Sequence, residues 1–189
     1  GSGNVSDETR ELEKFSALEL KLAGDVKIVQ ADEPSIQISA DDNLLPLIST
    51  QLTDGTLRIE STKSFSTNSK IKFLVAVPVI ERVEINGSGD LFLEEVTKDR
   101  LQLTISGSGS AGGTGSVDRL DATIAGSGKL LLDRVKAKQV TVTINGSADA
   151  GVFASESLTA TINGSGNVKY KGDPATVRPT INGSGKIEP

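Results

Sequence analysis

The phrase TINGSG stands at Thr161–Gly166 and is repeated, letter for letter, at Thr180–Gly185. Four near-copies precede it: VEINGSGD, LTISGSGS, ATIAGSGK and VTINGSAD. Each copy joins a run of alternating apolar and polar residues to a Gly-Ser-Gly or Gly-Ser-Ala triplet. Alternation with a period of two is typical of a β-strand with one buried face, and the triplet is typical of a tight corner. Each copy therefore predicts a strand that ends in a sharp change of direction.

The copies recur with an almost constant period. Their isoleucines, Ile85, Ile105, Ile124, Ile144, Ile162 and Ile181, are separated by 20, 19, 20, 18 and 19 residues. A second short alternation follows each corner, as at Leu91 and Leu93 or at Leu130 and Leu132. A unit of this size cannot fold alone, because ordering the chain costs about 1.5 kcal/mol per residue and its few inward side chains do not offset that. The period therefore indicates stacked units that share one core.

Two arrangements of the units are compatible with the pattern. A parallel coil is favoured, because residues that repeat at the same phase then stack, isoleucine on isoleucine inside and threonine on threonine outside. An antiparallel series of hairpins is the alternative, since Asn-Gly, a preferred two-residue hairpin turn, occurs at 86–87, 145–146, 163–164 and 182–183. We predict an all-β fold, a single-stranded right-handed parallel β-helix with coils of about 19 residues.

The N-terminal part is less regular than the rest. A length of 189 residues is typical of one domain. We expect residues 1–14 to form a flexible tether that follows a removed export signal, and residues 15–189 to form a single β-helix domain. Within it, 15–80 are irregular N-terminal coils and a cap, and 81–189 are the six repeats. In Ala40–Thr50 the alternation stops, and Asp41 and Asp42 are expected to cap a short helical turn, disturbed by Pro46, that covers one end of the stack.

Composition excludes several kinds of chemistry. The net charge is −5 and the lysines and arginines are scattered, so nucleic acid is not an expected partner. The chain has no Cys and no His, which removes disulfides, thiolate chemistry, His-based triads and the usual zinc ligands. The longest apolar run, Phe73–Ile80, has the length of a strand, so no transmembrane segment is expected. We expect no cofactor and no metal.

The corner motif resembles two ligand-binding signatures. Gly107–Gly112 matches the spacing of a dinucleotide fingerprint, but strand alternation follows it where that site needs a helix. Gly87–Asp90 is similar to a calcium-binding β-roll repeat, but the residue after the corner changes from copy to copy. We therefore interpret the corners as structural. They comprise Gly87, Ser88, Gly89, Gly107, Ser108, Gly109, Gly126, Ser127, Gly128, Gly146, Ser147, Gly164, Ser165, Gly166, Gly183, Ser184 and Gly185.

Carboxylates and aromatic residues are the remaining candidates for function. A glycosidase needs two carboxylates in one cleft, and Glu94 and Asp133 meet this condition only if their corners are close across an intervening coil. Phe92 and Phe153 stand at outward phases of their strands, so they are the candidates for a surface contact. The alternative for each phenylalanine is that a loop covers it. We predict no catalytic, cofactor or metal residues.

The order of the segments resembles a known family. ELEKFSALELKLAGDVKI is followed by DGTLRIE, then by IKFLVAVPVIERVEINGSGDLFL and the glycine-punctuated units. This order is similar to that of the bacterial auto-transporter adhesin family with a head GIN domain. The resemblance implies a β-helix fold and a secreted or lipid-tethered envelope protein of Gram-negative, Bacteroidetes-type bacteria, with no assigned catalytic residues. Ala148, in place of a corner glycine, and Ser106 and Ala125, in place of Asn, depart from the repeated pattern.

These observations lead to one functional expectation and two alternatives. We expect a non-catalytic adhesion or recognition module that is exported to the periplasm, the outer membrane or the cell surface. A surface glycan or a protein would be its partner, and it would form homo-oligomers through β-helix edges or faces. The alternatives are a carbohydrate-active β-helix enzyme and a self-associating structural component. An uncovered last coil, near Ile181 and Ile187, would favour self-association.

Overall fold

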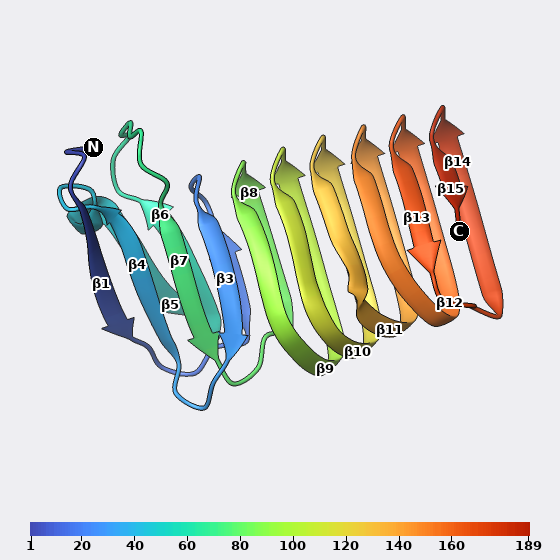
Figure 1. Cartoon of the computed structure of the whole chain (residues 1–189), viewed down its shortest axis with the longest axis horizontal. Helices are drawn as coiled ribbons and strands as arrows, with labels where there is room; N and C mark the ends of the chain where they lie inside the picture. Colours follow the sequence, from blue (N-terminus) through green and yellow to red (C-terminus); the bar gives the residue numbers. More distant parts are fainter.

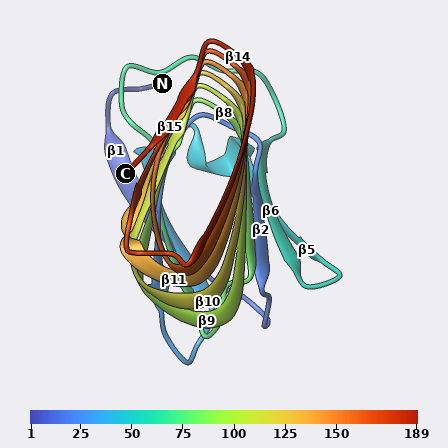
Figure 2. The same ribbon diagram turned by 90° about the vertical axis from the view of Figure 1, so that its right-hand side faces the viewer.

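The structure, a computed structural model, describes all residues from 1 to 189. The chain winds into a flattened coil, and its turns lie side by side along the long axis of the molecule (Figure 1). Viewed along that axis, the turns superpose into a narrow oval with two long walls (Figure 2). Strands make up nearly all of the regular structure, and one short 3-10 turn is the exception. The predicted all-β solenoid is confirmed.

Parallel strands build the repeat region. They are β8 (Arg82–Gly87), β9 (Asp90–Gly107), β10 (Ser110–Gly126), β11 (Lys129–Gly146), β12 (Asp149–Gly164), β13 (Asn167–Lys171), β14 (Thr176–Gly183) and β15 (Lys186–Glu188). The six aligned isoleucines pair with one another in register, as Ile105 of β9 does with Ile85 and Ile124. The antiparallel alternative is therefore wrong for the repeats. Each of β9 to β12 bends midway, so that one strand contributes to both walls.

The N-terminal region mixes both pairing directions. Its elements are β1 (Val5–Glu11), β2 (Ala17–Leu20), β3 (Asp25–Gln30), β4 (Ser35–Asp41), η1 (Leu45–Leu47), β5 (Ile48–Thr53), β6 (Thr56–Ser61) and β7 (Lys72–Val77). β2 and β3 run parallel to the repeats, whereas β1 with β4, β4 with β7, and β5 with β6 are antiparallel. Part of the expected tether is therefore the edge strand β1, because its backbone pairs along its whole length with β4.

A short helical turn forms where the alternation stops, as expected. The turn is the 3-10 helix η1, with Pro46 in its first positions. Its cap residue is Leu44 and no side chain caps it, so the expectation that Asp41 and Asp42 cap it is wrong. Asp41 instead accepts a hydrogen bond of 2.7 Å from the hydroxyl of Thr67. Figure 2 shows η1 across the oval at the N-terminal end, and Leu44 and Leu45 are buried there.

The repeats stack closely because glycine occupies two places in every corner but one, where Ala148 replaces the second glycine. The first, such as Gly164, has a φ of +141°, a conformation that L-residues rarely adopt. The amide of the following Ser165 donates to the carbonyl of Gly146 in the preceding coil, at 3.0 Å. The corner serines are exposed, and their backbone amides, not their hydroxyls, make the bonds between coils.

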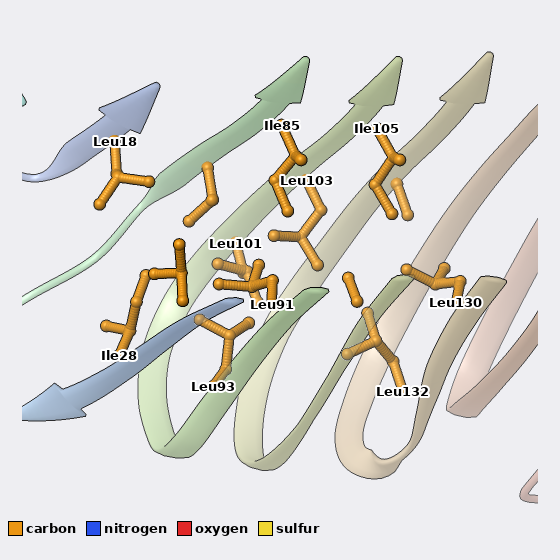
Figure 3. Packing of buried hydrophobic residues seen from close by; sticks show 14 of the residues in the cluster. Leu18, Ile28, Ile85, Leu91, Leu93, Leu101, Leu103, Ile105, Leu130 and Leu132 are labelled. Carbon is orange, nitrogen blue, oxygen red and sulfur yellow. The ribbon is translucent and has the colours of Figure 1, made fainter. Parts of the chain in front are cut away.

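One continuous core fills the space between the two walls. Inward side chains from both walls, such as Leu93 and Leu103, face each other across the coil (Figure 3). The core contains 46 buried residues and extends from Phe15 to Val168 without a break. No helix of the structure has the length and hydrophobicity needed to cross a membrane.

Candidate functional site

The outer face of one wall carries an unusual set of apolar side chains. This wall, here called the first wall, contains β1, β4, β7, β3, the first halves of β9 to β12, and then β13 and β15. Outward positions on a sheet of this kind are normally polar, because the inward positions already supply the core. Leu74, Phe92 and Leu131 point outward nevertheless, with 39%, 44% and 56% of their surfaces exposed.

These three side chains lie in one line across the strands. The strand register places Leu74 beside Lys27, and Lys27 beside Phe92. It places Phe92 beside Gly112, and Gly112 beside Leu131. We call this line of five residues the apolar row. Since neighbouring strands are about 4.8 Å apart, its three apolar side chains recur about every 9.6 Å along the solenoid axis.

A shallow hollow follows the apolar row. Its volume is about 660 Å³, and Leu74, Phe92 and Leu131 line it together with Gly112. A second hollow of about 570 Å³ begins at the other side of Leu131 and has Gly151 in its floor. Gly151 pairs with Leu131 in the register, so the second hollow continues the line of the first.

Gly112 and Gly151 differ from the corner glycines. A Cβ atom built at Gly112 would lie 3.5 Å from its nearest neighbour, and one at Gly151 would lie 3.7 Å away, which are ordinary contacts. A Cβ atom at Gly164, in a corner, would lie only 2.1 Å from a backbone oxygen. The fold therefore has room for a Cβ atom at both strand positions. Their glycines keep the floor beside Phe92 and Leu131 flat.

Charges of both signs border the apolar row. Asp25, Lys72, Asp90 and Ser110 line the first hollow on the side of the Gly-Ser-Gly corners. On the other side, the ammonium of Lys27 lies 2.9 Å from a carboxylate oxygen of Glu94. The border of the hollow is thus polar but close to neutral.

The two phenylalanines selected from the sequence have different surroundings. Phe92 is exposed, as expected. Phe153 is half-buried and lies between Lys136 and Lys171, because the register of β11 and β12 shifts just before it. Phe153 is therefore outside the apolar row.

The two carboxylates considered for catalysis are each paired with a different lysine. Asp133 accepts a hydrogen bond of 2.6 Å from Lys171, and this bond holds the pKa of Asp133 below its usual value although burial opposes the shift. Glu94 pairs with Lys27. A glycosidase acid needs the opposite shift, a pKa raised toward neutrality. No three His, Cys, Asp or Glu side chains lie close enough together to hold a metal ion.

The second wall contains β5, β6, β2, β8, the second halves of β9 to β12, and β14, and its outer face is polar and periodic in the repeats. Thr104, Thr123, Thr143, Thr161 and Thr180 stand side by side on successive strands. At the adjoining corner Asn163 donates to Asn145 at 2.8 Å, and Asn182 donates to Asn163 at 2.9 Å. The asparagine ladder thus pairs side-chain amides of successive coils with one another. In the last coil, Ile181 is 42% exposed and Ile187 is partly buried.

Sequence reasoning missed Leu74, Leu131 and Gly112. The signal was available for the last two, because Phe92, Gly112, Leu131 and Gly151 all stand at the fifth position after the first glycine of their corners. Leu74 carried no such signal, since it lies in the irregular part and only the pairing of β7 with β3 brings it into line.

Comparisons with known proteins agree with this architecture. The family model described as "Putative auto-transporter adhesin, head GIN domain" matches residues 14–174. No curated protein matches the chain.

Solved structures with the same fold include proteins from Bacteroides and Parabacteroides. A putative adhesin from Bacteroides fragilis has a TM-score of 0.80 and 23% identity, over 99% of this chain and 97% of its own. A putative lipid binding protein from Parabacteroides distasonis has a TM-score of 0.63 and 24% identity, over 100% and 97%. A putative adhesin from the same species has a TM-score of 0.63 and 20% identity, over 100% and 98%. At these identities the likeness establishes the fold alone.

Proposed function

This chain belongs to the auto-transporter adhesin family with a head GIN domain, and on that premise we propose that it is a non-catalytic adhesion module of the bacterial envelope. The module binds its partner through the outer face of the first wall. Its partner is a surface glycan or a protein. The solenoid serves as a support for this surface. The function depends on the side chains of the surface and not on the solenoid fold itself.

The apolar row is the observation that carries this proposal. Three large apolar side chains stand exposed in one line, while the inward positions of the same strands already fill the core. Exposed aromatic and aliphatic side chains gathered over a hollow mark a contact surface more often than scattered ones do. Phe92 lies in the middle of the line and is its natural anchor.

Two further points support a non-catalytic role in the envelope. The two carboxylates considered for catalysis, Glu94 and Asp133, are ion-paired, and the pKa of Asp133 is lowered where an acid catalyst would need it raised. The family description and the Bacteroidetes sources of the similar structures favour the envelope or the cell surface. The expected homo-oligomer remains a prediction.

Retention of the purified chain on immobilised glycans and extracellular-matrix proteins tests the proposal. We expect selective binding that Phe92→Ser weakens at least tenfold. Thr143→Val is the matched control, because it changes an outward side chain on the second wall and should leave binding intact. Binding that both variants retain would place the contact elsewhere, and absence of binding throughout would overturn the adhesion proposal in favour of an architectural role.

A further inference from the structure

We propose that the apolar row binds an uncharged, extended glycan of the β-1,4-linked type, lying along the solenoid axis. This inference rests on the proposed function, since it names the ligand class of the same surface. Four features of the first wall lead to it. They are the spacing of the apolar side chains, the glycines between them, the nearly neutral border, and the pairing of each strand of the row on both sides.

The spacing matches a ligand that repeats every two units. Leu74, Phe92 and Leu131 occupy every second strand, so apolar contacts recur about every 9.6 Å. In an extended β-1,4-linked chain, successive rings are turned over, and the same ring face recurs after two rings. One strand of the wall therefore corresponds roughly to one sugar ring. Apolar ring faces would lie over Phe92 and its two neighbours in the row, because aromatic faces pack well against such surfaces.

The glycine floor supplies room for the rings. Gly112 lies between Phe92 and Leu131, and no steric contact of the fold requires glycine there. Glycine inside a strand costs about 0.5–1 kcal/mol relative to alanine. Its presence at an outward position therefore points to an external requirement, namely the close approach of another molecule. Gly151 repeats the arrangement on the other side of Leu131.

The border of the row fits a neutral polyhydroxylated ligand. Asp25 and Asp90 offer acceptors, and Lys72 and Ser110 offer donors, so sugar hydroxyls find partners of both kinds. A polyanion would meet a border with three carboxylates and only two ammonium groups, which gives it no net attraction. An acyl chain would cover the row but would leave these polar groups without partners.

A peptide is a poorer fit than a glycan. Peptides that bind sheets commonly add a strand to an exposed edge, where free backbone groups are available. The apolar row lies on the face of the wall, and β3, β9, β10 and β11 are each paired on both sides. The row thus offers side chains but no backbone pairing.

Calorimetric titration of the full chain with defined oligosaccharides tests the inference. The probes are cellohexaose, xylohexaose and mannohexaose, with the corresponding disaccharides. We expect at least one hexaose to bind, and to bind at least tenfold more tightly than its disaccharide, because the line from Leu74 to Leu131 spans several rings. Maltohexaose, which is α-linked and curved, and the polyanion polygalacturonate should bind at least tenfold more weakly.

Gly112→Val is the decisive variant. The valine should be accommodated without loss of stability, since its Cβ has ordinary contacts and Val is favoured in strands. Its side chain would raise the floor and reduce hexaose affinity at least tenfold. Thr143→Val serves again as the control and should bind as the unchanged chain does. A melting curve for each variant separates loss of the site from loss of the fold.

Three outcomes would overturn the inference. They are no binding of any of the three hexaoses, hexaose binding that Gly112→Val leaves unchanged, and stronger binding to phosphatidylcholine vesicles than to every hexaose. If the chain meanwhile keeps Phe92-dependent retention on a matrix protein or on another glycan, the adhesion proposal stands and only the ligand class is wrong. Loss of both kinds of binding would overturn both proposals.

Discussion

The repeat region and the N-terminal region build the same two walls by different means. In the repeats, backbone groups make the contacts between coils, as where the amides of Ser127 and Ser147 reach glycine carbonyls of the coil before. In the N-terminal region, backbone bonds also join the strands, as where the amide of Asp25 reaches the carbonyl of Ile71, but side chains add contacts that occur only once. Arg10 donates to the carbonyl of Ile48 at 2.8 Å and to the hydroxyl of Thr50 at 3.0 Å. Backbone stacking gives every repeat the same contacts with its neighbour. In the N-terminal region, each side-chain contact occurs only once.

The apolar row crosses the boundary between these regions. Leu74 and Lys27 come from the N-terminal strands β7 and β3, and Phe92, Gly112 and Leu131 come from the repeats. The proposed contact surface therefore needs both regions in register. A substitution that distorts either region should therefore change the apolar row. The contacts that are lost should differ between the two regions.

The largest effect is expected at the first glycine of a repeat corner. Gly164→Val places a β-branched side chain at a φ of +141° and a Cβ atom 2.1 Å from the carbonyl oxygen of Gly146. Backbone strain and overpacking each cost about 1–3 kcal/mol, so a loss of about 3 kcal/mol or more is expected. Denaturant unfolding measures it. An unchanged midpoint would contradict the view that backbone geometry holds the repeats together.

A smaller effect is expected at the third position of the corner. A Cβ atom at Gly128 would lie 2.3 Å from the carbonyl oxygen of Gly109, yet the chain already has alanine at the equivalent Ala148. The stack can therefore adjust there, and Gly128→Ala should cost about 1–2 kcal/mol. The ratio of this loss to that of Gly164→Val, in the same denaturant assay, separates steric crowding from the φ requirement. Equal losses would mean that the two glycines serve the same purpose.

The difference between the regions also explains what the sequence could predict. The period predicted the parallel stacking, the inward isoleucines and the corner glycines. It could do so because the same sequence motif, and with it the same backbone geometry, occurs six times. The pairing of β1 with β4 and the contact between Asp41 and Thr67 could not follow, because each occurs once and joins residues far apart in the chain. The same holds for Leu74 in the apolar row. For Phe153, the register shift near Lys136 appears in the sequence only as the shorter, 18-residue interval from Ile144 to Ile162, which does not show where the shift falls.

Acid should act on the N-terminal region through Asp41. This carboxylate is only 1% exposed, and the hydrogen bond from Thr67 is the main cause that holds its pKa below the ordinary value of 3.8. A lowered pKa stabilises the fold above that ordinary value, and the contribution is lost as the pH falls through the folded pKa. We expect the amide of Ser69, which donates to the Thr67 hydroxyl at 2.9 Å, to lose protection from hydrogen exchange as the pH falls below about 4, while the repeats stay protected.

Asp41→Asn tests this assignment. The variant should weaken the protection of the Ser69 amide at neutral pH and remove most of its acid dependence. Asp42→Asn is the control, because Asp42 is exposed and its bonds are confined to Ser2 and Asn43. Acid dependence that persists in Asp41→Asn would place the sensitive group elsewhere.

The smallest effect is expected at Phe92, where the two regions meet. Phe92→Ser should reduce stability by less than about 1 kcal/mol, because 44% of the side chain is already exposed and its burial contributes little. Phe153→Ser should cost more, about 1–2 kcal/mol, since Phe153 is half-buried between two lysine stems. Thermal melting of both variants checks the order. A large loss at Phe92 would mean that this side chain holds β3 to the repeats, and its exposure would then reflect a structural joint in place of a binding surface.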